Sequence, residues 1–422
     1  MTTRTRFYTD DFMSPRLFTP RFLLMFGYSF TVFTSVFQLL PTAPYRVIAL
    51  GGSTGEAGLF LGLLTFSSAL FAPITGPITD RLGHRRVLIV VSLVLTAFPL
   101  SYALIDDYRL LLVAVIPHGL IWSALLTASG AYMTATIPPS RRGEGFGYWG
   151  LAAIFAVGTA PAIGFWVYSH GWAALCFEIV LLNLLMAFIA WRLPEDRPAA
   201  GPRRMAPRDL ARLAHAARPA RALQIARRHV EWRVLGLGLG LALVSFGYGS
   251  LTSFSALFTD ALGVAPRSLF LSVMAVAVVI GRLTVGRALD RLGHRRVLLP
   301  SLVAPAVGLL MIAFAQGRLT LAAAAIVFGA GFGLMHPAFT AYVMGHVDDS
   351  RRGAAFGAIL AAFDTGIGSG SSVLGWLVHA HGYRIAFAVA SGIAALALPY
   401  FLIAERRLGF EEAGTLRPVH QS

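Results

Sequence analysis

Lysine is absent from this 422-residue sequence, and cysteine occurs once, at Cys176. Without lysine there is no Gly-x-x-x-x-Gly-Lys-Ser/Thr loop, which excludes an ATP-driven pump of that type within this chain. One cysteine excludes an internal disulfide and a multi-cysteine metal site, and no His-Glu-x-x-His pair occurs. We therefore expect no metal, no cofactor and no enzymatic activity.

Charge is also scarce. Charged residues make up 13% of the chain, hydrophobic residues 56%, and the mean hydropathy is +0.68, whereas an average soluble domain is about 25% charged. The net charge of +15 comes from 35 basic residues, all arginine. These arginines punctuate apolar runs instead of clustering with aromatic residues on a polar surface, so a nucleic-acid partner is not expected.

The apolar runs have the length of membrane spans. A bilayer core about 30 Å thick needs about 20 apolar residues of helix. We predict an all-α membrane protein with twelve transmembrane helices, at 22–40, 55–79, 87–105, 110–135, 145–168, 173–191, 234–258, 268–289, 297–315, 319–343, 354–378 and 385–403.

The arginines predict the orientation, because short loops retained in the cytoplasm collect positive charge. The tails and the loops after the even-numbered spans hold 28 arginines, and the alternate loops hold five. We therefore expect a multi-pass protein of a bacterial inner membrane, in contact with its lipids, with both termini in the cytoplasm.

Five regions are predicted along the chain: a cytoplasmic tail (1–21), a six-helix bundle (22–193), an Arg-rich linker (194–232), a second six-helix bundle (233–405) and a cytoplasmic tail (406–422). The linker is either solvated or forms in part a basic amphipathic helix on anionic lipid.

The two bundles are related by an internal repeat with a shift of 210 residues. The segment Asp80-Arg81-Leu82-Gly83-His84-Arg85-Arg86-Val87 recurs unchanged from Asp290 to Val297, and Ser140 to Gly143 recurs as Ser350 to Gly353. After one inserted residue, His170-Gly171 matches His381-Gly382. This register predicts two pseudo-symmetric halves of six helices each.

A parallel repeat of six helices resembles the major facilitator superfamily, and within it the efflux permeases and drug:proton antiporters. The stretch from Gly76 to Arg86 resembles the superfamily signature Gly-x-x-x-Asp-Arg-x-Gly-Arg-Arg/Lys between its second and third helices. The resemblance implies a gating role for the motif residues. The alternative is that the loop is only a turn that sets the membrane orientation. The motif residues are Gly76, Asp80, Arg81, Gly83, Arg85 and Arg86, with Gly286, Asp290, Arg291, Gly293, Arg295 and Arg296 in the second half.

Two further comparisons with the superfamily bear on the direction of transport and on its coupling to protons. On the fifth span, Pro161 and Gly164 match an exporter signature, while alanines replace its two leading glycines; small residues there still allow close helix packing. On the fourth span, His118-Gly119 stands where drug:proton antiporters carry Arg-x-x-Gln-Gly. Efflux is favoured, but coupling must use another residue or be absent.

Asp364 is the leading candidate for proton coupling. It lies about eleven residues into its span, and therefore near the bilayer midplane, where ionisable groups are costly and mark function. A desolvated carboxyl group favours its neutral form, so Asp364 could load and release a proton, unless it is a structural carboxylate satisfied by neighbours. His336, His118 and Glu178 are further candidates, which could equally be packing residues.

Other polar and aromatic residues fall on spans expected to line a central cavity: Tyr28, Gln38, Trp122, Thr127, Tyr248, Ser253, Arg282 and Thr340. If they face a cavity and not the bilayer interface or the core, its walls suit amphipathic or hydrophobic organic molecules. The sequence thus predicts a monomeric secondary transporter, a proton-coupled exporter of small organic molecules. An uptake symporter for a small acid or sugar and a membrane sensor without transport are the alternatives.

Overall fold

The computed structural model describes residues 17–195, 231–292, 294–348 and 351–410. Within these ranges every regular element is a helix. The predicted linker and tails lie almost wholly outside them. Also outside are Gly293 and, as regards side chains, Asp80, Gly286, Asp290 and Arg291.

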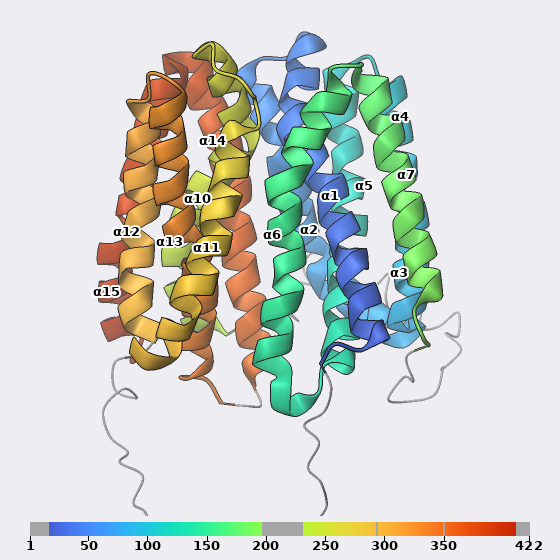
Figure 1. Cartoon of the computed structure of the whole chain (residues 1–422), viewed down its shortest axis with the longest axis vertical. Coiled ribbons are helices and arrows are strands. Elements are labelled where there is room, and N and C mark those ends of the chain that lie inside the picture. The colour runs from blue at the N-terminus through green and yellow to red at the C-terminus, as the bar shows by residue number, and fades with distance from the viewer. Residues whose placement is uncertain (1–16, 196–230, 293, 349–350, 411–422) are drawn as a thin grey trace, which may run out of the picture.

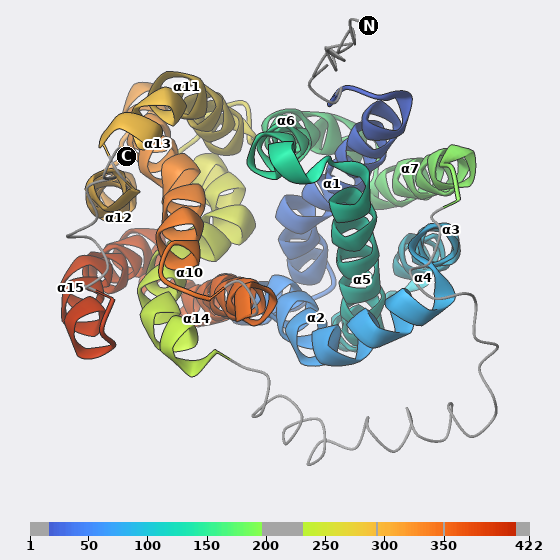
Figure 2. The same cartoon turned by 90° about the horizontal axis from the view of Figure 1, so that it is seen from below.

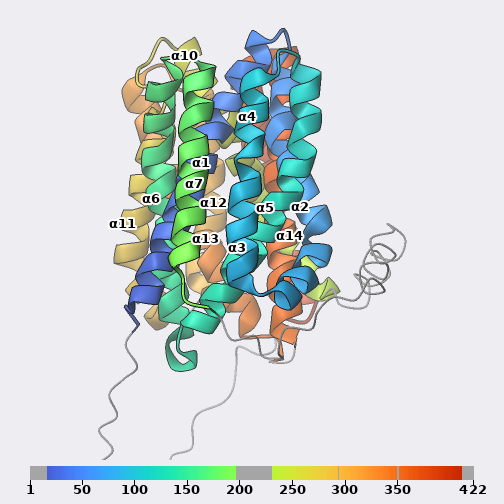
Figure 3. The same ribbon diagram turned by 90° about the vertical axis from the view of Figure 1, so that its right-hand side faces the viewer.

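The helices of the first half form one bundle, seen at the right of Figure 2. They are α1 (Pro20–Ala49), α2 (Thr54–Leu82), α3 (His84–Leu95), α4 (Ala97–Leu104), α5 (Tyr108–Thr136), the short η1 (Pro139–Arg141), α6 (Arg142–Tyr168) and α7 (Trp172–Arg192). α3 and α4 follow one another along a single line (Figure 3) and together make one span, His84–Leu104.

The helices of the second half form the other bundle, at the left of Figure 2. They are α10 (Trp232–Ala261), α11 (Leu269–Leu292), α12 (His294–Ala313), α13 (Arg318–Met344), α14 (Arg352–Ala395) and α15 (Ala397–Arg407). α14 is 44 residues long, but Gly382 within it has a φ of 81°, outside the helical region. The chain turns back at this residue, so α14 and α15 together supply two spans.

Among the described residues, ten stretches are long and apolar enough to cross a membrane. One of them, Ala354–Arg407, has 54 residues and crosses twice because of the turn at Gly382. The shorter apolar helix Leu269–Thr284 completes twelve crossings. The predicted all-α membrane protein with two six-helix bundles is confirmed, and several helices extend beyond the predicted spans, as α1 does.

Local sequence explains where these helices begin and turn. Ser53 and Glu56 form a capping box at the start of α2, with Ser53 N 2.7 Å from Glu56 Oε2. Asp107 caps α5 by accepting from Arg109 N at 2.8 Å. Gly171 and Gly382, which match in the repeat, both have positive φ, 116° and 81°. The same conformation thus links the last two spans of each half.

The buried apolar residues form three clusters, and their distribution shows where the halves join. We call the end that carries the α2–α3 turn at Gly83 and the start of α12 at His294 the motif end. The other end, with the turns at Gly51 and Gly263, is the distal end (Figure 1). One cluster holds residues of both halves and reaches the distal end. At the motif end each half has its own separate cluster. The two bundles therefore share a core only away from the motif end.

Candidate functional site

At the distal end, the surface between the halves is closed by backbone contact between α2 and α14. A Cβ atom on Gly58 would overlap the carbonyl oxygen of Ser371, and one on Gly375 would lie 2.6 Å from the carbonyl oxygen of Thr54. A Cβ atom on Gly62 would overlap the side-chain hydroxyl of Ser372 and would lie 3.2 Å from the carbonyl oxygen of Gly368. These glycines let the two helices approach as closely as their backbones allow. We call this contact the distal seal.

A hydrogen-bond chain crosses the distal seal. Ser371 Oγ donates to the carbonyl oxygen of Gly58 at 2.7 Å, across the two halves. Ser371 Oγ also lies 2.7 Å from Ser253 Oγ on α10, and because the Ser371 proton is already used, Ser253 is the donor. Ser253, one of the predicted cavity residues, is thus a buried part of the seal.

A second contact between the halves lies nearer the surface of the distal end. Tyr45 on α1 donates its hydroxyl to Asp260 Oδ2 on α10 at 3.0 Å. Arg267 pairs with the same carboxylate at 2.9 Å and lies over the Tyr45 ring, 5.1 Å from its centroid. We call these three residues the distal latch.

Toward the motif end, the facing sides of α2 and α14 no longer contact one another. On α14, Gly375, Ser371 and Gly368 face α2, and the helical period continues this face to Asp364 and Gly357. Gly357 is exposed with no atom within 4 Å of its Cβ position. On α2, Leu70 is 71% exposed one turn beyond Phe66, which contacts Gly368. The two halves are therefore joined at the distal end, and this face of α14 is no longer covered by α2 toward the motif end.

Three ionisable side chains of the second half lie where the distal seal ends. Asp364 is partly exposed, and its carboxylate has no hydrogen-bond or ion-pair partner among the described residues. His336 on α13 is also partly exposed, and its ring meets the Phe363 ring edge-on at 5.2 Å. Arg282 on α11 donates its Nε to the carbonyl oxygen of Gly333 at 3.0 Å.

Arg282 also lies at the junction of the halves. α6 and α11 run side by side there (Figure 1), and a Cβ on Gly150 of α6 would be 3.7 Å from Arg282 Nη1. Farther along, Gly158 of α6 faces Ala275 at 3.1 Å. No carboxylate of the described residues pairs with Arg282.

A run of stacked aromatic rings begins beside His336, and a second group of rings lies in the first half. Phe332 stacks on Tyr248 at 4.3 Å and on Phe363 at 6.1 Å between ring centroids. In the first half, Phe33 lies 6.2 Å from both Phe37 and Trp122. All of these rings pack on the cluster that both halves share. The sequence predicts Tyr248 and Trp122 as cavity residues, but it does not single out Phe332 and Phe363, because phenylalanine occurs 30 times and gives no positional signal.

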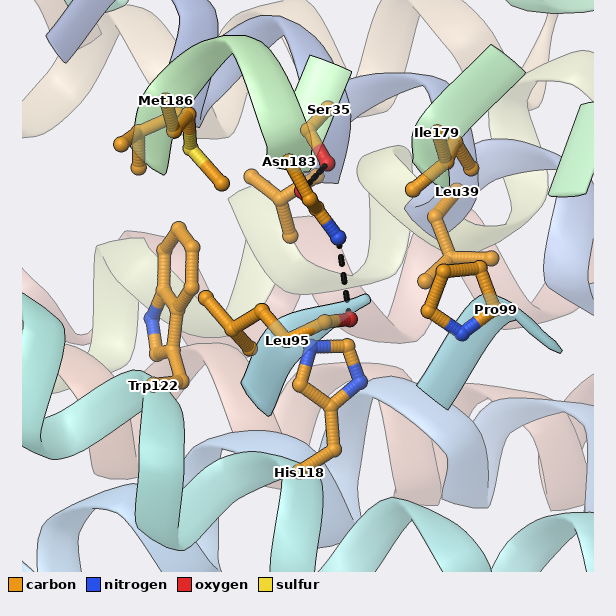
Figure 4. A pocket seen from close by; sticks show the side chains of 11 residues that line it. Ser35, Leu39, Leu95, Pro99, His118, Trp122, Ile179, Asn183 and Met186 are labelled. Atoms are coloured by element: carbon orange, nitrogen blue, oxygen red, sulfur yellow. Dashed lines mark hydrogen bonds between the residues drawn. The ribbon is translucent and has the colours of Figure 1, made fainter. Parts of the chain in front are cut away.

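His118 lies inside the first bundle, away from the three ionisable groups. It is 6% exposed, its Nδ1 is 2.9 Å from the hydroxyl of Tyr102, and its ring stacks on Phe98 at 4.6 Å. It lines a cavity of about 10 Å³ (Figure 4), which is room for one water molecule. Trp122 lines the same cavity, and Asn183 lies across it between Ser35 and the carbonyl of Leu95.

Glu178 lies on α7 and accepts a hydrogen bond from Gln38 Nε2 of α1 at 3.2 Å. Its other carboxylate oxygen is buried without a partner among the described residues. Gly164 of α6 packs against Gln38, with 2.9 Å between its Cβ position and Gln38 Cβ, and Pro161 lies one turn earlier in the same helix. These residues connect α1, α6 and α7 within the first half.

The remaining predicted cavity residues have local contacts. Tyr28 is fully buried and lies 2.9 Å from Ser92 Oγ. Thr127 bonds the carbonyl of Ser123 at 2.8 Å. Thr340 lies one turn from His336 on α13, and its buried hydroxyl has no partner among the described residues.

Two of the described motif arginines, Arg85 and Arg295, bind the C-terminal segment of their own half. Arg85 donates to the carbonyl oxygen of Trp191 at 2.5 Å and pairs with Glu195 at 3.4 Å. Arg295 makes two bonds to Glu405, at 2.9 and 3.0 Å, and Tyr342 also donates to this carboxylate. Arg85 and Arg295 are related by the 210-residue shift, and each pairs with a carboxylate near the C-terminal end of its own half.

The other described motif residues make fewer contacts. Gly76 lies 3.8 Å from Thr127 at its Cβ position, and Gly83 has the positive φ of 85° that turns α2 into α3. Arg81, Arg86 and Arg296 lie at the motif end. Among the part of the chain that is described, no three His, Cys, Asp or Glu side chains are grouped to hold a metal ion.

Comparison with known proteins matches this architecture. A profile described as Major Facilitator Superfamily matches residues 22–287 and 237–418. An uncharacterized MFS-type transporter of Pseudomonas aeruginosa is 29% identical over 399 residues, covering 88% of this chain and 91% of the relative. The staphylopine export protein of Staphylococcus aureus is 22% identical, covering 81% and 85%. The crystal structure of nucleoside transporter NupG has a TM-score of 0.70 at 16% identity, covering 92% of this chain and 99% of that one.

Proposed function

Because the chain belongs to the Major Facilitator Superfamily, we propose that it exports small organic molecules across a bacterial inner membrane in exchange for protons. Substrate would bind between the two halves, which open alternately to each side. The arginine distribution supports a cytoplasmic motif end and cytoplasmic termini. On this assignment the structure is the inward-facing state, with the distal seal and distal latch closing the periplasmic side.

The observation that carries the proposal is the position of Asp364. Its carboxylate is unpartnered among the described residues, and it lies on the face of α14 that is sealed against α2 at Ser371 and exposed at Gly357. An ionisable group within the membrane is costly, so its presence there indicates a function. As the opening alternates between the two ends, this carboxylate is exposed to each side in turn and can carry a proton between them.

The motif residues fit a role in the opposite state. When the distal end opens, the motif end must close, and the α2–α3 turn around Gly76 and Arg81 then meets the other half. The pairs Arg85–Glu195 and Arg295–Glu405 hold each turn to the C-terminal segment of its own half. The turn would therefore move as one body with its bundle.

Export is supported by two features. Pro161 and Gly164 resemble an exporter signature on the fifth span, and one relative is named as an export protein. The aromatic walls around Phe332 and Phe33 suit amphipathic or hydrophobic substrates better than sugars, because a sugar requires many hydrogen-bonding groups.

The test uses inverted membrane vesicles, whose interior corresponds to the periplasm. An acid-inside proton gradient should drive accumulation of exported amphipathic compounds by the wild type. Asp364→Asn keeps the size of the side chain but cannot titrate, so we expect it to lose gradient-driven accumulation while still exchanging substrate without a gradient. The matched control is Asp348→Asn, at an exposed carboxylate.

Each other outcome has a distinct meaning. Full gradient-driven accumulation by Asp364→Asn excludes Asp364 as the proton carrier. Substrate loss from the vesicles under the same gradient indicates an uptake symporter. No flux under any gradient indicates a sensor without transport.

A further inference from the structure

Arg282 is a cation inside the membrane-spanning bundle whose charge is not balanced by any carboxylate of the described residues. Its one hydrogen bond to the described residues, from Nε to the carbonyl oxygen of Gly333 at 3.0 Å, orients the guanidinium group. The far edge, at Nη1, is directed toward Gly150, where the opposite half has no side chain. An arginine in this state presents a rigid pair of donors, which is the arrangement that recognises a carboxylate with two hydrogen bonds.

His336 provides a second donor near this cation. Gly333 and His336 are three residues apart on α13, so they lie on one face of the helix, and Arg282 is bonded to the first of them. The His336 ring makes an edge contact with Phe363 and has no hydrogen-bond partner among the described residues. Arg282 and His336 are therefore two neighbouring groups with unused hydrogen-bonding capacity, on two helices of the same half.

The surroundings define the rest of the ligand. The stacked rings of Tyr248, Phe332 and Phe363 lie beside His336, and flat rings of this kind favour a flat apolar body. A cationic ligand is disfavoured near Arg282 because like charges repel strongly where water is scarce. A neutral ligand would leave the cation unbalanced.

We infer that Arg282 and His336 bind the carboxylate of an aromatic organic anion whose ring system lies against Phe332 and Phe363. This inference names the substrate class of the proposed transporter and rests on that function. Asp364 remains free to carry the proton. The residues that bind the substrate carboxylate and the residue that carries the proton are therefore on separate helices. Substrate binding neutralises Arg282 and thereby lowers the cost of closing the motif end over it.

The test is binding of three probes of the same shape and different charge to the purified full-length protein in detergent. The probes are 2-naphthoate, neutral 2-naphthamide and 2-naphthylmethylammonium, measured by isothermal titration calorimetry. We expect the wild type to bind naphthoate at least about tenfold more tightly than naphthamide, since a charge-assisted pair contributes about 1.5–3 kcal/mol. Arg282→Gln should remove this preference by weakening naphthoate and leaving naphthamide unchanged.

The control is Arg318→Gln, which removes the same charge from an exposed arginine at the distal end and should bind like the wild type. Should Arg282→Gln not fold, Arg282→Lys decides: the charge remains but the fork is lost, so naphthoate alone should weaken. The inference is overturned by an unchanged preference in the Arg282 variants, by tighter binding of the ammonium, or by no binding of naphthoate. Because no gradient is present, these outcomes are independent of proton coupling, which the vesicle experiment tests.

Discussion

The distal latch can be weakened at one atom. Tyr45→Phe removes the hydroxyl that donates to Asp260 across the halves at 3.0 Å. It keeps the ring, which packs at 5.5 Å on Phe165 and lies under the guanidinium of Arg267. The pair between Arg267 and Asp260 lies within the second half and is also kept. The change in free energy therefore reports one hydrogen bond between the halves.

The size of the effect follows from the exposure of the acceptor. A buried hydrogen bond to a charged group contributes about 1.5–3 kcal/mol. The Asp260 side chain is 34% exposed, and water competes for it, so we expect about 1 kcal/mol. The ratio of molecules with an open distal end to those with a closed one should then rise about fivefold.

Double electron–electron resonance measures this ratio directly. Spin labels are attached to cysteines introduced at His170 and Arg318, which are exposed at the distal end of the two halves. The native Cys176 is 1% exposed, so it interferes little. Tyr45→Phe should increase the population with the longer distance between labels.

The control is Tyr108→Phe. Its hydroxyl donates to Glu56 at 2.8 Å, again a tyrosine bonded to a carboxylate at the distal end, but within one half. An unchanged ratio in Tyr45→Phe would refute the latch, and an equal rise in both variants would show that any lost tyrosine hydroxyl has this effect.

Three other changes give further predictions. Gly58→Val should keep the distal end from closing, because the new side chain would overlap the backbone of Ser371. Gly130→Ala should not, because no atom lies within 4 Å of the Cβ position of Gly130. The same spin labels measure the effect of both substitutions. Glu405→Gln should lower the free energy of unfolding by about 1–3 kcal/mol, since it weakens buried bonds from Arg295 and Tyr342. The control is Glu195→Gln, at the partner of Arg85, whose side chain is 73% exposed. It should change the free energy of unfolding by less than about 1 kcal/mol, and chemical denaturation in detergent distinguishes the two variants. Phe332→Ala should weaken the binding of both 2-naphthoate and 2-naphthamide about tenfold or more, whereas Arg282→Gln should weaken only 2-naphthoate. If calorimetry shows that Phe332→Ala binds 2-naphthamide as tightly as the wild type does, the ring of Phe332 does not contact the ligand.

The sequence was sufficient for the fold because its two strongest signals are global. Apolar runs of bilayer length and a repeat held in register over the chain predicted two bundles of six helices, and the structure confirms them. Helix ends were less accurate: α1 continues to Ala49 through Pro41 and Pro44, whereas apolarity alone ended the span at Leu40.

The site was harder to predict from the sequence, because the rotation of a helix that is apolar on all sides cannot be inferred from its residues. Arg282, His336 and Asp364 stood out singly as ionisable residues in apolar runs, but nothing in the sequence placed them on adjoining helices. His118 and Tyr28, which look equivalent to them in sequence, are instead directed into the first bundle. The distal latch was missed because Tyr45, Asp260 and Arg267 lie in or near loops, where polar residues are expected.

The distal seal has a mechanical consequence. Long side chains can follow a moving partner by changing rotamer, but the glycines of α2 and the backbone of α14 have no such adjustment. A small rotation of one bundle therefore breaks the contact along several helical turns at once. In the proposed transport cycle, the barrier would then be either shut or fully parted, with no half-open passage for protons.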